Sequence, residues 1–302
     1  MNYRFGLTAN SRGKPLPRML IMGILSVWGC SSQLPALAVA APAETGLRLS
    51  WEQKNNNGYV VIDGDHLPGR IKVWYIELYM RPGSHASYPD GVIRHTTRPV
   101  QADAQNQWLK LRCDLDDGVV VEHKITVDSD VVRFEVTASN RTPNPSDVAW
   151  GAPCIIVDEF TGSDKFSYLP QCFVFLDNEL ARLPVEPWAT EAVETPGQVW
   201  CPAHVDRRDV EPHPLSELVV SNGLIGCFSK DENLILATAW QPWQNLFQGI
   251  IACLHSDFRI NGLQPGETKK IRGAIYVTTD KIPQLLRRYE HDFPEHFGPA
   301  RL

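Results

Sequence analysis

The sequence lacks the features by which nucleic-acid-binding and nucleotide-using proteins are usually found. Its 302 residues carry a formal net charge of −6, so there is no basic surface for a phosphate backbone. It contains no glycine-rich phosphate loop, no dinucleotide-binding fingerprint and no zinc-protease helix motif. These absences exclude nucleotide chemistry and predict that nucleic acid is not a partner.

Long apolar runs are also scarce. Met19–Trp28 is too short to span a bilayer, and no later segment is long and apolar enough to form a transmembrane helix. Basic residues and no acidic ones precede this run, and Ala38–Ala40 gives the small-x-small pattern of a cleavage site. We therefore expect a signal peptide over residues 1–40. Residues 41–302 should form a single exported domain, periplasmic or extracellular.

An alternative reading makes Cys30 the lipid-attachment cysteine of an anchored bacterial lipoprotein, and only then would a membrane be a partner. The bulky Trp28 beside the cleavage point and the apolar tract after Cys30 speak against it.

Cysteine is too thinly spread for a disulfide-dense scaffold. If Cys30 leaves with the signal, the remaining six are Cys113, Cys154, Cys172, Cys201, Cys227 and Cys253. All but Cys172 and Cys201 lie inside apolar strand patterns, which is typical of buried free thiols. Cys172 and Cys201 flank a loop-rich region and are the preferred pair if a disulfide exists.

What the chain does have is strand periodicity. Apolar and polar residues alternate over 119–127 and again over 131–139, on either side of an Asp128-Ser129-Asp130 turn. This period of two indicates paired strands with one buried face. Further strands are expected at 47–51, 59–62, 71–80, 109–113, 154–157, 218–221, 224–229, 234–240, 250–254 and 271–277. The strands 218–221 and 224–229 are expected to form a hairpin about Asn222-Gly223, and a loop is expected from Trp240 to Gly249.

One helix is expected near the C-terminus. Asp280 is a suitable N-cap, Pro283 falls in the first turn, and the segment ends near Phe293. About a dozen strands with short turns and a single helix predict an all-β fold. We expect a large antiparallel β-sandwich, of the supersandwich type, with one short C-terminal helix.

Tryptophan gives the first functional signal. Nine tryptophans are present, and five of them fall in or beside expected loops. One of these loops is the proline-rich stretch 184–214, which holds Trp188 and Trp200. Flat aromatic rings stack on the C–H-rich faces of sugars in concave binding sites, whereas the plainer interpretation is that they fill the core. The predicted sugar-binding residues are Trp150, Trp188, Trp200, Trp240 and Trp243.

The second signal is Cys253-Leu254-His255-Ser256-Asp257 at a strand end. In an extended segment His255 and Asp257 project to the same side, so Asp257 could orient His255 as a general acid or base. His204 is the candidate for a second proton carrier. The plainer interpretation is a strand-end histidine capped by a loop carboxylate. Ser256 lacks the glycine-flanked elbow of a nucleophilic serine.

Other polar residues carry weaker signals. Cys201 and His204 are three residues apart, but without a second pair at zinc-finger spacing they predict no metal site, and no cofactor is expected. His123 lies on the apolar face of its strand and is expected to be a hydrogen-bonded core residue. Asp158 and Glu159 could supply a catalytic carboxylate or could simply end a strand in solvent.

Several segments resemble the galactose-mutarotase-like β-sandwich superfamily. They are the strand 131–140 ending in Asn140, the Trp150-Gly151-Ala152-Pro153 step, and a Pro-Gly-Glu turn before the strand 271–277. The resemblance implies that fold and a sugar-related role. That family places a catalytic histidine just after the glycine of its active-site strand, where this chain has Pro153 and Cys154. Simple aldose epimerisation is therefore not implied.

Together these features predict an exported carbohydrate-active or carbohydrate-binding protein whose partner is an oligo- or polysaccharide. They leave the reaction unassigned. The alternative is a non-catalytic glycan-binding or structural protein of the cell envelope.

Overall fold

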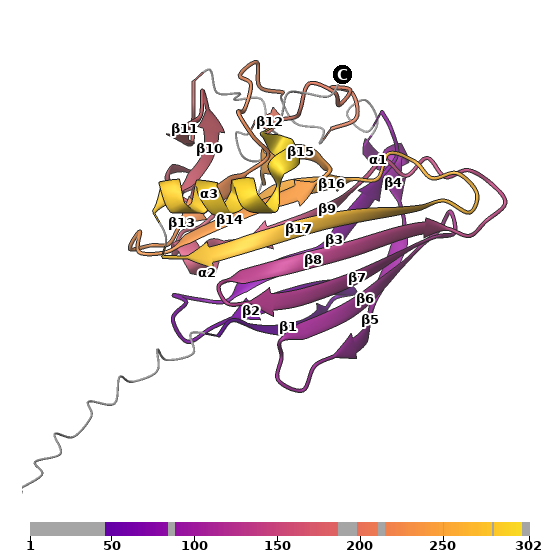
Figure 1. Cartoon of the computed structure of the whole chain (residues 1–302), viewed down its shortest axis with the longest axis horizontal. Helices are drawn as coiled ribbons and strands as arrows, with labels where there is room; N and C mark the ends of the chain where they lie inside the picture. Colours follow the sequence, from indigo (N-terminus) through magenta and orange to yellow (C-terminus); the bar gives the residue numbers. More distant parts are fainter. Residues whose placement is uncertain are drawn as a thin grey trace, which may run out of the picture. The chain divides into compact units, whose positions relative to one another are not determined.

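The computed structural model has two antiparallel β-sheets that pack against each other (Figure 1). It describes residues 46–83, 88–186, 198–210, 215–249, 251–279 and 281–297. The predicted all-β sandwich with one short C-terminal helix is confirmed, and all described residues fall in one unit, Pro42–Leu302. The signal-peptide region and Trp188 lie outside the described residues.

The first sheet, called sheet A, has the strand order β1-β2-β3-β9-β16-β15-β12, and β4 pairs with β3 beside this path. Its strands are β1 (Arg48–Lys54), β2 (Asn57–Asp63), β3 (Ile71–Met80), β4 (Val92–Ile93), β9 (Trp150–Ile156), β12 (Val199–Trp200), β15 (Trp243–Gln248) and β16 (Cys253–Arg259).

The second sheet, called sheet B, has the order β11-β10-β13-β14-β17-β8-β7-β6-β5. Its strands are β5 (His95–Ala102), β6 (Trp108–Leu115), β7 (Val119–Asp128), β8 (Val131–Asn140), β10 (Cys172–Leu176), β11 (Glu179–Arg182), β13 (Ile225–Phe228), β14 (Ile235–Gln241) and β17 (Thr268–Thr278). The helical segments are α1 (Tyr88–Gly91), α2 (Asp158–Thr161), α3 (Ile282–Asp292) and two 3₁₀ turns, η1 (Leu169–Gln171) and η2 (Pro294–His296).

The main core lies between the two sheets. The predicted alternation in β7 and β8 buries one face of each strand. Three rings join the sheets: Trp240 of sheet B lies 5.1 Å from Phe134 of the same sheet and 4.9 Å from Phe258 of sheet A. Gly273 of β17 lets the Trp240 ring approach the backbone, since a Cβ there would lie 2.5 Å from that ring.

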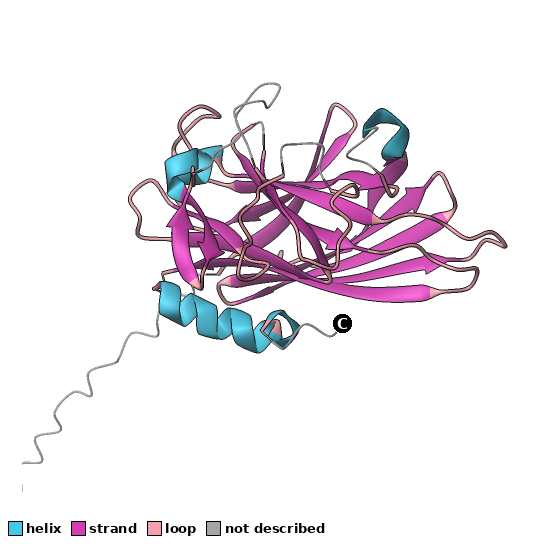
Figure 2. Ribbon diagram, turned by 90° about the horizontal axis from the view of Figure 1, so that it is seen from above, coloured by secondary structure: helices cyan, strands magenta, loops and turns pink. Residues whose placement is uncertain are grey.

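Helix α3 covers the outer face of sheet B and completes a second apolar cluster (Figure 2). Its buried Leu285 and Tyr289 pack with Phe173 and Tyr276 of the sheet. The helix begins at Ile282 with Pro283 in its first turn, as predicted. The predicted N-cap, Asp280, lies outside the described residues.

Two sequence-based expectations were wrong. The segments 218–221 and 224–229 do not form a hairpin, because Val220 bridges to Leu176 while β13 pairs with β10 and β14. The segment from Trp240 to Gly249, expected as a loop, holds the end of β14 and all of β15. Every residue of β15 is buried, its three polar residues included, so no solvent-exposed face imposes an alternating pattern on its sequence.

Candidate functional site

The most irregular part of sheet A surrounds Pro153, in the centre of β9. Proline has no N–H to donate to a β-ladder. Three residues of β3, 75–77, stand opposite Pro153 alone. On the other side, β16 pairs with β9 up to His255 and resumes at Phe258. Both ladders of β9 are therefore interrupted at the same level.

Polar side chains occupy these interrupted positions. Glu77 lies in the β3 bulge and Asp257 in the β16 gap, while Asn245 lies in a further irregularity where β15 meets β16. Because Leu254 belongs to the core between the sheets, the alternation of β16 directs His255 and Asp257 to the outer face of sheet A. Pro153 thus marks the place where β-structure gives way to a cluster of polar groups.

His255 stands at the centre of this cluster. Its Nε2 lies 3.6 Å from Oε2 of Glu77, and its Nδ1 lies 3.3 Å from Oδ1 of Asp257. Asn245 Nδ2 donates to the other oxygen of Asp257 at 2.8 Å. The imidazole is therefore held between two carboxylates, one of which is itself fixed by an amide. The predicted pairing of His255 with Asp257 is present in the structure.

Two thiols complete the cluster. Cys154 of β9 stands directly across the ladder from His255, and Cys253 lies two residues before His255 on the same face of β16. The ligand atoms of Cys154, Cys253 and His255 all lie within 4.8 Å of one another. Both cysteines are buried and free.

The electrostatics of the cluster favour charge separation. Burial alone would raise the pKa of Cys253, but hydrogen bonds with Cys154 and His255 outweigh it and lower that pKa to about 6. Burial would likewise lower the pKa of His255, and Asp257 and Cys253 reverse this to a pKa well above the ordinary value. Burial raises the pKa of Glu77 to about 7 against the opposing attraction of His255.

Glu77 is the member of the cluster that reaches a pocket. Its side chain is 25% exposed, whereas that of His255 is 5% exposed. The pocket, of about 510 Å³, lies at the edge of β3 between the β1–β2 turn and the segment 92–97. Its lining includes Gln53, Asn56, Asn57, Trp74, Glu77 and Arg94.

The β15 side of the cluster is closed by an apolar layer. Phe247 packs its ring 5.6 Å from that of His255 and forms a small cluster with Val199, Val205 and Val210. Gln244 of β15 donates to the backbone oxygen of Asp209 at 2.7 Å, which ties the segment after β12 to the sheet. Solvent therefore reaches the cluster from the Glu77 side.

The structure places the predicted tryptophans differently from the sequence-based expectation. Each of the four that are described is part of a strand, and each is at most 8% exposed. A ring buried to this degree has no free face for a sugar, so the burial gives the stacking prediction no support. These tryptophans are Trp150, Trp200, Trp240 and Trp243.

His204 is exposed in the segment after β12. Burial and the nearby Arg259 lower its pKa. The contacts recorded among the described residues do not join His204 to His255. Neighbouring Asp206 binds the side chain of Arg208.

Other expectations can be settled from the contacts. His123 is a buried, hydrogen-bonded core residue as predicted, with Nδ1 2.9 Å from the Tyr75 hydroxyl. The preferred Cys172–Cys201 disulfide is absent, since all six cysteines within the described part of the chain are free. Cys172 instead stands opposite Cys227, in β13 of sheet B. Glu159 is an exposed partner of Lys72 at 3.4 Å.

Sequence reasoning did not single out Glu77, Trp74 or the convergence of Cys154 and Cys253 on His255. Glu77 is the only carboxylate in the strand Ile71–Met80, where Lys72 is the only other charged residue, and this contrast with the apolar neighbours is the available signal. The convergence of the two thiols is not visible in the sequence, because Cys154 and Cys253 come from distant segments and meet only through the pairing of β9 with β16. Spacing along the chain had drawn attention to Cys201 instead.

No protein-family model matches the chain, and neither does any curated protein. Among solved structures, the chain is similar to a galactose mutarotase-like protein from Clostridium acetobutylicum, with 8% identity, 77% of this chain and 99% of that chain covered, and a TM-score of 0.43. A candidate aldose 1-epimerase from Escherichia coli shares 11% identity over 77% of this chain and 99% of its own, with a TM-score of 0.40.

A galactose mutarotase-like protein from Lactobacillus casei shares 6% identity over 76% of this chain and 100% of its own, with a TM-score of 0.36. These are similarities between structures at 6–11% identity, and no activity is carried over from them to this chain. Among the described residues, no helix combines the length and apolar character needed to cross a bilayer.

Proposed function

We propose that the protein is exported and binds a carbohydrate in the pocket at the edge of β3. The observation that carries the proposal is the pairing of Trp74 with Glu77 in one pocket of about 510 Å³. Trp74 is half-buried, so part of its ring remains free for a sugar face, unlike the four buried tryptophans above.

The rest of the pocket lining suits the hydroxyl groups of a sugar. Gln53, Asn56 and Asn57 offer both donors and acceptors, Arg94 offers donors only, and Glu77 offers acceptors. The ring of Tyr59, 6.4 Å from that of Trp74, supports the indole from one side.

The test of carbohydrate binding is a Trp74→Ala variant on an array of oligo- and polysaccharides. Loss of the stacking surface should weaken the affinity for any bound glycan about tenfold, which corresponds to ~1.4 kcal/mol. Trp108→Ala, which removes a partly buried tryptophan from β6 of sheet B, is the matched control and should bind normally. Equal affinity of the Trp74→Ala and wild-type proteins would contradict the proposed pocket.

A catalytic role is a second candidate function, favoured by the His255–Asp257 pair directly behind Glu77. A protein that only binds glycans has no need for a histidine held between two carboxylates. His255→Ala should abolish turnover of a glycan substrate while leaving glycan affinity within a few-fold. Retained turnover would remove His255 from the chemistry and leave the binding role in place.

A further inference from the structure

The polar cluster behind the pocket contains more metal-ligating groups than carbohydrate binding requires. Within the described residues, Cys154, Cys253 and His255 are the one group of three or more His, Cys, Asp or Glu side chains whose donor atoms converge. Thiolate and imidazole are the ligands that zinc prefers. Two zinc-bound sulfurs in a tetrahedron lie about 3.8 Å apart, given Zn–S bonds of about 2.3 Å. The 4.8 Å limit on the donor atoms leaves room for such an ion.

The surroundings of His255 are those of a ligating histidine. Metal-bound histidines almost always pair their second ring nitrogen with a carboxylate or carbonyl, which fixes the tautomer. Here Oδ1 of Asp257 lies 3.3 Å from Nδ1 of His255, and Asn245 Nδ2 donates a hydrogen bond of 2.8 Å to the other carboxylate oxygen of Asp257. Nε2 is then the nitrogen left for a metal, and it is directed toward Glu77 at 3.6 Å.

A second cysteine–histidine contact in the same molecule provides an internal comparison. Cys113 Sγ lies 3.4 Å from His123 Nε2 in the core. That histidine has the hydroxyls of Tyr75 and Tyr79 as its other partners, and only one thiol is present. The arrangement around His255 differs in its second thiol, its carboxylate behind the ring, and its partly exposed Glu77.

We propose that Cys154, Cys253 and the Nε2 of His255 bind a divalent transition metal, zinc by their chemistry, with Glu77 beside an open fourth position that faces the pocket. Two sulfurs, one nitrogen and a position open to ligand match the ligand count of a catalytic rather than a purely structural zinc site. Under this assignment His255 is a ligand and Asp257 its positioning residue. The inference rests on the cluster alone and does not require the ligand of the pocket to be a sugar.

Cobalt titration of the chelator-treated, reduced full-length protein tests the assignment, with Co²⁺ and then Zn²⁺ as the only probes. We expect one cobalt per chain, a thiolate-to-cobalt charge-transfer band, visible absorption of tetrahedral intensity, and loss of both when zinc is added. Cys154→Ser, Cys253→Ser and His255→Gln should each weaken binding by more than about tenfold. Asp257→Asn, which removes only the support of the ligand, should weaken it about 10–100-fold.

The controls use buried cysteines outside the cluster. Cys113→Ser and Cys227→Ser should keep the charge-transfer band at full intensity. If the cluster variants fail to fold, as judged by circular dichroism, the band in the wild-type protein and in the Cys113→Ser/Cys227→Ser double variant still reports ligation by the remaining thiols.

Absence of the band in folded, reduced wild-type protein would overturn the metal assignment. So would a Cys154–Cys253 disulfide in protein purified without reductant. Because cobalt binding is read without any glycan and the Trp74→Ala experiment without any added metal, failure of one proposal is distinguishable from failure of the other.

Discussion

At the scale of single residues, the protein holds two buried histidines in opposite electrostatic settings. Burial lowers the pKa of His123 to about 3, and its partners there are hydroxyl and thiol groups that cannot compensate a positive charge. Around His255, Asp257 and Cys253 outweigh the same burial and raise the pKa. The neighbours, and not the depth of burial, decide the direction in which the pKa of each histidine shifts.

The low pKa of His123 predicts a loss of stability in mild acid. The unfolded chain protonates this histidine near pH 6.5, whereas the folded protein resists protonation down to about pH 3. The unfolded state therefore binds more protons in this window, and the free energy of unfolding should fall by up to about 1.4 kcal/mol per pH unit as the pH drops below 6.5. Urea denaturation across this range measures the slope.

His123→Gln supplies the control, since glutamine can hydrogen-bond Tyr75 or Tyr79 but does not titrate. The difference in stability between this variant and the wild-type protein should shrink or reverse as the pH falls. Parallel loss of stability in both proteins would show that other groups cause the acid sensitivity.

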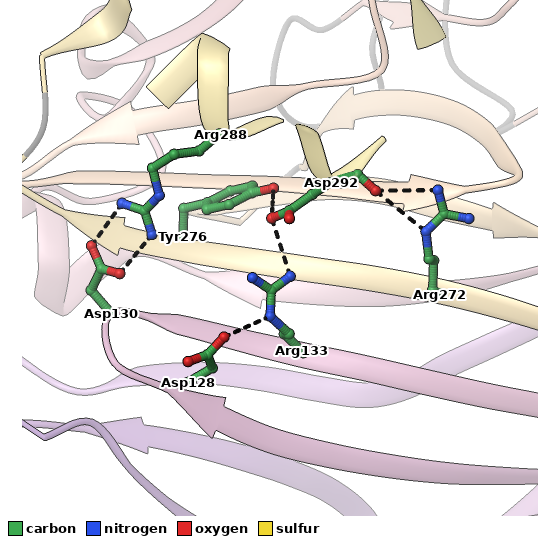
Figure 3. A network of polar contacts seen from close by, with 7 residues as sticks. All are labelled: Asp128, Asp130, Arg133, Arg272, Tyr276, Arg288 and Asp292. Carbon is green, nitrogen blue, oxygen red and sulfur yellow. Dashed lines mark hydrogen bonds and ion pairs between the residues drawn. The ribbon is translucent and has the colours of Figure 1, made fainter. Parts of the chain in front are cut away.

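At the scale of elements, α3 combines an apolar face with a network of ion pairs (Figure 3). Arg288 of the helix forms two hydrogen bonds to Asp130 in the β7–β8 turn, at 2.9 and 2.6 Å. Asp292 accepts from Arg133 at 3.1 Å and from the Tyr276 hydroxyl at 2.8 Å. Because the Arg288 and Asp130 side chains are each 32% exposed, solvent screens this pair, and the buried apolar contacts should hold the helix more strongly.

Two substitutions in α3 separate these contributions. Leu285→Ala empties a fully buried position and should lower the free energy of unfolding by about 2–5 kcal/mol. Arg288→Met keeps the aliphatic stem and should cost about 1 kcal/mol or less, a cost that high salt reduces further. Urea denaturation at two ionic strengths measures both losses of unfolding free energy. A larger loss for Arg288→Met than for Leu285→Ala would show that the ion pairs, and not the apolar contacts, hold α3 on the sheet.

The elements themselves were predictable where one face meets solvent. β7 and β8 alternate between core and surface, so their pattern is legible in the sequence. β15 is buried on both faces, and β10 nearly so, and neither has a solvent-exposed face that would reveal its period. The same limit applies to the site. The pairing of His255 with Asp257 follows from a spacing of two, but Glu77 joins them only through a bulge that sequence spacing does not encode.

At the scale of the whole molecule, strand order brings the site together. The site is formed by four neighbouring strands of sheet A, in the order β3, β9, β16 and β15. In the sequence, β9 and β16 are far apart, because β10, β11, β13 and β14 of sheet B lie between them. The cluster therefore exists only in the folded protein.

Export predicts a defined N-terminus for the mature protein. Expressed in a bacterial host with its full sequence, the chain should be recovered from the periplasm or medium beginning at Ala41, because cleavage is expected after Ala40. Intact-mass measurement of the fractionated protein determines this. A membrane-bound form that begins at an acylated Cys30 would establish the lipoprotein alternative instead.

Because of Pro153, two polar residues of the cluster lie outside the hydrogen-bonded ladders that hold sheet A together. Where a ladder is continuous, the backbone of each residue is fixed by hydrogen bonds to the neighbouring strands. A substitution there can therefore disturb the register of the strand. At Pro153 both neighbouring ladders are already open, so Glu77 and Asp257 lie where backbone pairing makes no demand on them. Substitutions of Glu77 or Asp257 should therefore disturb strand register little, whereas His255 and Cys154 remain paired in the ladder.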